Sequence, residues 1–216
     1  MFQKSQDQSY MKLIVERLKE EKPLVWTNQF CNLLKDFSVS SINDIGCQVG
    51  QFYKALKYNK LSLDYYGFDI EKKYLKVFNE KFKECKKRIK KLDISKQKPT
   101  EVDASIISAT LEHIENYKQS LENILQPTKK IAIVRTFLGE EYKSSLVWKE
   151  KAKSPYLIQQ FDFETIYRIF NEQGFVFQII QDEYTKSIPQ FINLDYRSHK
   201  PVFRTQYIIL AKRDIC

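Results

Sequence analysis

Apolar residues recur at helical spacing through the first forty residues of the chain. One stripe runs along residues 10–18, from Tyr10 through Ile14 to Leu18. A second stripe, which includes Trp26 and Phe30, follows Pro23, a residue that is favoured in the first turn of a helix. The pattern therefore predicts two amphipathic helices within residues 7–36.

From residue 41 the pattern changes to short apolar runs that alternate with amphipathic segments. The runs predict seven strands, at Ile42–Ile45, Leu63–Phe68, Ile89–Leu92, Val102–Ala109, Ile131–Val134, Phe175–Ile180 and Gln206–Ala211. Helical patterns follow the first, second and fourth runs and precede the sixth. Such alternation predicts an α/β fold with a mostly parallel sheet and helices on both of its faces. Because no clear helix separates the last two runs, we expect the last strand to be antiparallel.

Composition narrows the class of protein. The 216 residues are 43% hydrophobic and 14% aromatic, which favours one folded domain over a disordered chain. The longest apolar runs fall well below the roughly 18 residues of a membrane span, and the N-terminal residues lack the apolar core of a signal peptide. The four cysteines are scattered and there are only two histidines, so we expect no metal site, reduced thiols and a cytoplasmic protein.

The net charge of +9 leaves two interpretations open. It can indicate a polyanionic partner, and residues 81–91 contain seven Lys or Arg residues in eleven positions. It can also reflect lysine as the ordinary surface residue, which the occurrence of cations along the whole chain favours. In the basic run, Tyr74, Phe78, Phe82 and Cys85 form an apolar stripe that would turn most of the lysines toward solvent.

The residues that follow the predicted strands carry the candidate chemistry, because open parallel sheets bind ligands at the carboxyl ends of their strands. The turn Asp44–Gly50 lacks the glycines of a dinucleotide fingerprint, since Gln48 and Gln51 occupy two of those positions, and it lacks the Gly-Lys pair of a P-loop. Asp69 follows the second strand, and its carboxylate suits the paired hydroxyls of a ribose. Asp93 could accept a hydrogen bond from an adenine amino group. The residues predict a nucleoside site without a pyrophosphate, with Ile70 and Ile94 as its apolar walls.

This series of strand ends resembles the class I S-adenosylmethionine-dependent methyltransferases over residues 41–134. Asp44–Gly50, Tyr66–Asp69, Leu92–Ile94 and Ser108–Ile114 are similar to the first four motifs of that family, and Gln48 departs from the first. The resemblance implies a Rossmann-like, doubly wound, seven-stranded sheet and S-adenosyl-L-methionine as the cofactor. It implies ribose binding by Asp69 and a methionine site beside the first turn. The implied cofactor-binding residues are Asp44, Gly46, Cys47, Gly50, Asp69, Ile70, Asp93, Ile94, Thr110 and Leu111.

The resemblance also implies an activity. The form of the fourth motif, Leu111-Glu112-His113, is similar to that of small-molecule methyltransferases, so we expect methyl transfer to an oxygen or nitrogen atom of a small molecule. His113 is the candidate base, with a structural or acceptor-orienting role as the alternative. Two other functions remain open: an RNA or protein methyltransferase, motivated by the charge, and a non-catalytic binding module, motivated by Gln48.

We expect a single methyltransferase domain over residues 1–216, with a helical cap (1–40), a cofactor-binding core (41–136) and acceptor-side additions (137–216). Two long connections in the last part, Gly139–Gln160 and Asp182–Arg204, are rich in aromatic residues that could form an acceptor pocket or a satellite core. Among these residues are Trp148, Tyr184, Phe191, Tyr196 and His199. The oligomeric state is not indicated.

Overall fold

A computed structural model of the chain describes residues 8–147, 155–186, 191–193, 201–203 and 206–214. Its α-helices are α1 (Gln8–Lys19), α2 (Val25–Lys35), α3 (Gln51–Tyr58), α4 (Lys72–Lys81), α5 (Tyr117–Leu125) and α6 (Phe163–Glu172), with short 3₁₀ helices η2 (Lys83–Arg88) and η3 (Leu111–His113). The main sheet contains β1 (Ser41–Ile45), β2 (Asp64–Asp69), β3 (Ile89–Lys91), β4 (Val102–Ser108), β5 (Thr128–Gly139), β8 (Phe175–Gln181) and β11 (Gln206–Arg213). These seven strands are the seven that the sequence predicts.

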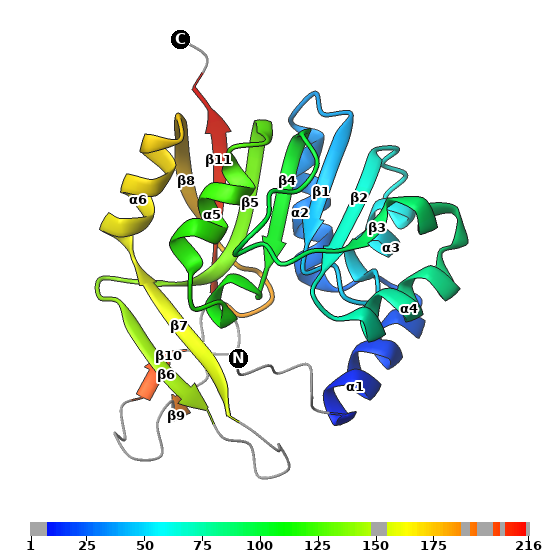
Figure 1. Cartoon of the computed structure of the whole chain (residues 1–216), viewed down its shortest axis with the longest axis horizontal. Coiled ribbons are helices and arrows are strands. Elements are labelled where there is room, and N and C mark those ends of the chain that lie inside the picture. The colour runs from blue at the N-terminus through cyan, green and yellow to red at the C-terminus, as the bar shows by residue number, and fades with distance from the viewer. Residues whose placement is uncertain (1–7, 148–154, 187–190, 194–200, 204–205, 215–216) are drawn as a thin grey trace.

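The strand order is β3-β2-β1-β4-β5-β11-β8 (Figure 1). Strands β1 to β5 pair in parallel, and β11 pairs antiparallel with both β5 and β8. The expected doubly wound, mostly parallel sheet with an antiparallel last strand is therefore confirmed. The order reverses at β1, whose neighbours are β2 and β4, so ligand chemistry is expected where these three strands end.

Helices cover both faces of the sheet. Apolar residues of α1, α2, α3 and α4 share one buried cluster, which includes Phe30, Phe52 and Phe78. Residues of α5 and α6 form a second cluster on the opposite face, around Leu121 and Phe170. Helix α6 begins where Asp162 accepts a hydrogen bond from the backbone N–H of Thr165 at 2.7 Å. The central strands are therefore packed between two layers of helices, which hold the strand ends in place.

Element boundaries differ by a few residues from the sequence interpretation, most clearly at three places. Pro23 does not open α2, which begins at Val25 after Leu24. Helix α4 ends at Lys81, so Phe82 and Cys85 continue the apolar stripe from η2 rather than from one helix. Strand β5 is longer than its apolar centre and extends to Gly139, because its last residues remain buried. None of the three changes the topology.

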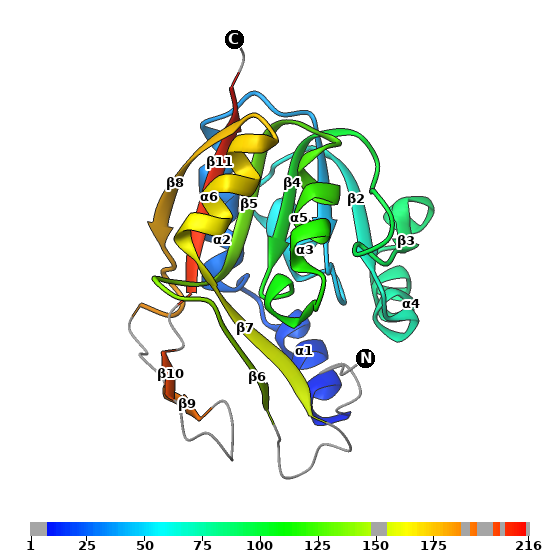
Figure 2. The ribbon, with the colours of Figure 1, turned by 60° about the vertical axis from the view of Figure 1, so that its left-hand side comes forward.

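The largest addition is a β-hairpin that the sequence analysis treated as a connection. Strands β6 (Lys143–Val147) and β7 (Tyr156–Asp162) pair antiparallel, and β7 joins the end of β5. Figures 1 and 2 show the hairpin extending from the carboxyl ends of the parallel strands, on the side where α1 also lies. Strands β9 (Phe191–Asn193) and β10 (Pro201–Phe203) form a separate small sheet. The hairpin and α1 thus lie at the end of the sheet at which a ligand is expected.

In the described part of the chain, no helix is long and apolar enough to cross a membrane.

Candidate active site

The turn after β1 is held against the end of β2. The backbone N–H groups of Gly46 and Cys47 both donate to the carbonyl oxygen of Phe68, at 2.7 and 3.0 Å. Gly46 has a φ of +76°, and a Cβ atom at this position would collide with the side chain of Thr110. Glycine is therefore required here both by backbone conformation and by the close approach of the segment that follows β4.

Gln48 adopts the left-handed conformation, with a φ of 48°. Its backbone N–H donates to Oδ2 of Asp69 at 3.0 Å, and its side-chain Nε2 donates to the hydroxyl of Tyr10 at 3.1 Å. The departure from the family motif thus costs backbone strain of about 1 kcal/mol. The same residue connects the turn to β2 and to α1 through these two hydrogen bonds.

Asp69 ends β2 and is 6% exposed. Its Oδ1 accepts from the backbone N–H of Glu71 at 2.8 Å, while Oδ2 accepts from Gln48. Each carboxylate oxygen retains a second lone pair for a further donor. Burial raises the pKa of Asp69 to about 6, against the opposing effect of the two backbone donors. Asp69 does not occupy the N-cap position of α4, which belongs to Glu71, so helix capping does not explain this acid.

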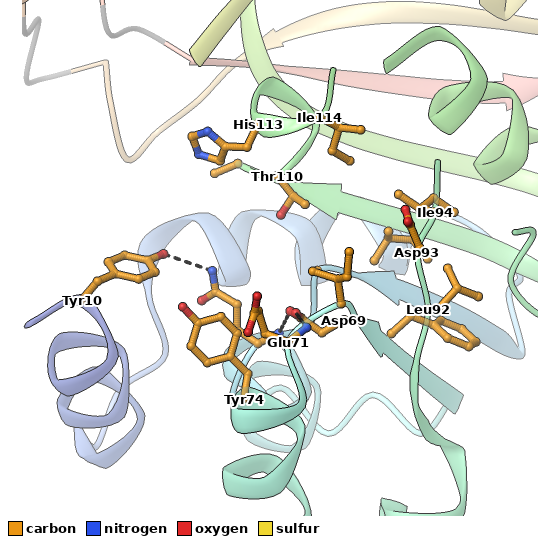
Figure 3. Close-up of a pocket in the computed structure, with 16 residues that line it drawn as sticks. Tyr10, Asp69, Glu71, Tyr74, Leu92, Asp93, Ile94, Thr110, His113 and Ile114 are labelled. Carbon is orange, nitrogen blue, oxygen red and sulfur yellow. Dashed lines mark hydrogen bonds between the residues drawn. The ribbon is translucent and has the colours of Figure 1, made fainter. Parts of the chain in front are cut away.

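A cavity of about 150 Å³, which we call the Asp69 cavity, opens at the ends of β1, β2 and β4 (Figure 3). Its floor and walls combine apolar side chains at the strand ends with the buried carboxylate. Among its lining residues are Gly46, Asp69, Ile70, Asp93, Ile94 and Thr110. The cavity therefore has an acceptor for hydroxyl groups on one side and isoleucine walls on the other.

Asp93 lines the Asp69 cavity but also holds its own turn. Its Oδ1 accepts from the backbone N–H and the hydroxyl of Ser95, at 3.2 and 2.6 Å, and its Oδ2 lies 3.6 Å from Nζ of Lys96. Asp93 can therefore stabilise its own turn and still contact a ligand in the cavity. The side chain is 23% exposed, which leaves it accessible to a ligand in the cavity.

A second cavity of about 410 Å³, the Glu112 cavity, adjoins the first. The two share lining residues at the carboxyl ends of β1 and β4, together with one residue of α1. These shared residues are Tyr10, Gly46, Gln48, Ala109 and His113. Ala109, like Gln48, has a positive φ of 48°, so strained backbone is concentrated where the cavities meet. A ligand that fills the Asp69 cavity can therefore present a group to a second molecule in the Glu112 cavity.

Buried polar groups form the far wall of the Glu112 cavity. Glu112 accepts hydrogen bonds from Nε2 of Gln206 at 2.8 Å and from the hydroxyl of Thr136 at 3.2 Å. Arg135 forms a bidentate pair with Asp182, at 2.9 and 2.8 Å, in which the two side chains are 4% and 0% exposed. Asp182 also accepts from the backbone and hydroxyl of Thr185. The wall is thus a satisfied network that joins β5, β11 and the segment after β8.

His113 lies at the junction of the two cavities, in η3. Its Nδ1 is 2.6 Å from the carbonyl oxygen of Leu157 in β7, and its ring packs edge-on against Tyr156. A carbonyl oxygen can only accept, so Nδ1 carries the proton and the neutral ring has its lone pair on Nε2. The hairpin therefore fixes both the orientation and the tautomer of this histidine.

Comparisons with known proteins agree with this geometry. Residues 43–134 match the family model described as "Methyltransferase domain". This part of the chain is therefore similar to a methyltransferase domain. No curated protein matches the chain in sequence.

Solved methyltransferase structures share the fold. Magnesium protoporphyrin IX methyltransferase from Synechocystis PCC 6803, with bound S-adenosylmethionine, is 16% identical, with a TM-score of 0.61 over 97% of this chain and 93% of that one. An S-adenosylmethionine-dependent methyltransferase from Clostridium acetobutylicum ATCC 824 is 12% identical, with a TM-score of 0.64 over 96% and 99%. The N-terminal domain of EvdMO1, in the presence of S-adenosylhomocysteine and D-fucose, is 12% identical, with a TM-score of 0.60 over 91% and 85%. At such low sequence identity, the structural similarity shows that the fold is shared and no more. The molecules bound in these structures are consistent with the cofactor that the motifs imply.

The structure distributes the residues of the four motifs over three places. Six of the ten expected cofactor residues line the Asp69 cavity, namely Gly46, Asp69, Ile70, Asp93, Ile94 and Thr110. Asp44 and Cys47 line the Glu112 cavity instead. Leu111 is fully buried in the α5 cluster, and Gly50 precedes α3 with a φ of +94° and packs against Phe78 and Phe82. Those two residues shape the site from behind and line neither cavity.

Sequence reasoning missed several lining residues. Helix α1 contributes Tyr10 and Arg17 to the lining of the Glu112 cavity. Three further lining residues lie in segments that were interpreted only as core strands or as part of a motif, namely Glu112, Arg135 and Gln206. For Glu112 the signal was present, since it lies inside the fourth motif. Ile158 and Tyr184 show that both long connections contribute to the cavity wall, whereas Trp148, Tyr196 and His199 lie outside the described residues.

Asp44 is a second buried acid at this end of the sheet. It is 5% exposed and its Oδ2 accepts from the hydroxyl of Tyr65 at 2.6 Å. Burial raises the pKa of Asp44 to about 7, with a smaller contribution from the nearby Asp69. In the described residues there is no group of His, Cys, Asp or Glu side chains that could hold a metal ion.

Proposed function

We propose that this chain is an enzyme that transfers the methyl group of S-adenosyl-L-methionine to an oxygen or nitrogen atom of a small molecule. The observation that carries the proposal is the position of Asp69. Its carboxylate faces a cavity that begins at the Gly46 turn, at the point where the strand order reverses. An acid turned away from this cavity would have removed the basis for the proposal.

The residues present fit the donor. Asp69 would accept from the ribose hydroxyls, and Ile70 and Ile94 would contact the two faces of the adenine. Asp93 would accept from the adenine amino group. Arg17, which lines the Glu112 cavity from α1, would pair with the carboxylate of the methionine part. When bound, the sulfonium supplies an already activated methyl group, so the protein's contribution is mainly binding and orientation.

Gln48 bears on the alternative of a non-catalytic module. If Gln48 deformed the turn after β1, the backbone of that turn would move away from Asp69. In this structure, however, the Gln48 N–H stays within 3.0 Å of the Asp69 carboxylate. This geometry favours a functional donor site.

A small molecule is favoured as the acceptor because the Glu112 cavity has the size of a small-ligand site and is walled by buried side chains. Two of the similar structures are also of proteins whose descriptions name small molecules, a magnesium protoporphyrin and D-fucose. The buried free thiols of Cys31, Cys47 and Cys85 suit a reducing compartment such as the cytoplasm.

Calorimetry with S-adenosylmethionine tests donor binding. We expect a dissociation constant in the micromolar range and competition by S-adenosylhomocysteine, and the absence of binding would contradict the proposal. Incubation of a metabolite extract with the enzyme and methyl-labelled donor then tests the acceptor class. Label should enter small molecules, whereas label in RNA or protein would overturn the small-molecule assignment.

His113 is proposed as the base that accepts the acceptor's proton at Nε2. With an acceptor found by labelling, His113→Ala should lower turnover by about 100-fold, a much larger change than that in the donor dissociation constant. His113→Gln can still donate to Leu157 but cannot take a proton. Recovery of turnover in the glutamine variant would indicate an orienting role, and near-full turnover in the alanine variant would exclude both roles.

A further inference from the structure

The excess positive charge of the chain is confined to one segment. Residues 72–98 contain twelve Lys or Arg residues and three Asp or Glu residues, a net charge of +9. The whole chain has the same net charge, so the remaining 189 residues are neutral in sum. Cations do occur along the whole chain, but outside this segment carboxylates balance them.

The structure gathers these cations at one edge of the molecule. The segment forms α4, η2, β3 and the turn after β3, which lie at the right-hand end in Figure 1. All twelve basic residues are exposed, because Tyr74, Phe78, Phe82 and Cys85 turn the apolar side of the segment into the core. We call this the Lys86 surface; its members are Lys72, Lys73, Lys76, Lys81, Lys83, Lys86, Lys87, Arg88, Lys90, Lys91, Lys96 and Lys98.

The carboxylates of the segment are too few to neutralise this surface. Of its three acids, Asp93 pairs with Lys96, and Glu84 pairs with Lys57, which lies outside the segment. Asp64, also outside it, pairs with Arg88. An excess of close cations over anions raises the local positive potential, and a bound polyanion would lower it.

Protection of the sheet edge accounts for only part of the surface. Strand β3 is the edge strand, and Lys90 and Lys91 would discourage pairing with another chain. The lysines of α4 and η2 do not lie on that edge strand, so edge protection gives no reason for their excess.

We propose that the Lys86 surface binds the phosphate backbone of a nucleic acid. Lysine ammonium groups suit phosphates through charge, without base recognition. Membrane attachment is less well supported, because none of the large apolar side chains exposed in the described residues belongs to residues 72–98. The surface begins beside the Asp69 cavity, which Tyr74 and Leu92 line, so a bound strand would lie next to the proposed donor site. This binding does not depend on the proposed methyl transfer.

The test is a fluorescence anisotropy titration of a labelled oligouridylate of about 20 nucleotides at several salt concentrations. The surface variant replaces Lys81, Lys83, Lys86 and Lys87 with Gln. The control variant replaces four exposed lysines outside the segment with Gln, namely Lys19, Lys22, Lys35 and Lys118. Because each variant loses four lysines, the two have the same net charge. We expect the surface variant to bind at least about tenfold more weakly at low salt and its salt slope to fall by about 3, while the control stays close to wild type.

Three results would overturn the inference: no oligouridylate binding by the wild type at low salt, an equal loss in both variants, or binding to anionic phosphatidylserine vesicles but not to the oligonucleotide. Calorimetry with S-adenosylmethionine on the surface variant separates this inference from the enzymatic one. None of the four substituted lysines lines either cavity, so donor affinity should be unchanged even if nucleic-acid binding is lost.

Discussion

Replacing Asp69 with Ala is expected to weaken the binding of S-adenosylmethionine by at least about 100-fold, measured by calorimetry near pH 7.5. The substitution removes the charged acceptor for two ribose hydroxyls, and a hydrogen bond to a charged group contributes about 1.5–3 kcal/mol. It also leaves the backbone N–H groups of Gln48 and Glu71 without their carboxylate acceptor.

Asp64→Ala is the matched control for this substitution. Asp64 begins the same strand, at the opposite end from Asp69, and its exposed side chain pairs with Arg88. Its loss should leave donor affinity within about twofold, since exposed ion pairs contribute little. If the Asp69 variant bound the donor as tightly as the Asp64 variant does, the assignment of the Asp69 cavity to the donor would be wrong.

The free energy of unfolding is expected to fall as the pH rises from about 4 to about 7. The pKa of Asp44 is raised to about 7 and that of Asp69 to about 6, both chiefly by burial. Between the ordinary pKa of an Asp, about 4, and these values, the folded state holds protons that the unfolded state has released. Stability is therefore greatest at the acid end of this window, and each group contributes a slope of about 1.4 kcal/mol per pH unit.

Urea unfolding at several pH values measures this slope, and Asp44→Asn separates the contribution of one group. The asparagine variant keeps an oxygen that can accept from Tyr65 but has no charge, so it should be more stable than wild type by roughly 2–4 kcal/mol near pH 8. Asp162→Asn serves as the comparison, because the pKa of Asp162 is lowered by its hydrogen bonds to Thr165 and its proton uptake falls below this window. A slope unchanged by Asp44→Asn would refute the explanation.

The sequence predicted the sheet well because its central strands are buried on both faces. Ile42, Ile106 and Ile133 are fully buried members of short strands rich in β-branched residues, and the helices between these strands have clear apolar stripes. The position of Asp69 could also be predicted from the sequence, because it depends only on where β2 ends. These features are local, and local periodicity is sufficient to reveal them.

The acceptor side of the site could not be derived in the same way. Tyr10 and Gln206 are almost two hundred residues apart in the sequence, yet both line the Glu112 cavity. The hairpin residues Tyr156–Asp162 alternate poorly between apolar and polar, because most of them are buried against η3 and β5. Their assignment depends on tertiary packing, which leaves no periodic signal.

The buried pair of Arg135 and Asp182 has an evolutionary consequence. Loss of either partner alone would leave an uncompensated charge in the interior, at a cost of about 3–5 kcal/mol, whereas replacement of both by apolar residues can be nearly neutral. Homologues should therefore carry the arginine and the aspartate together or lack both. Positions 135 and 182 should accordingly covary across related genomes.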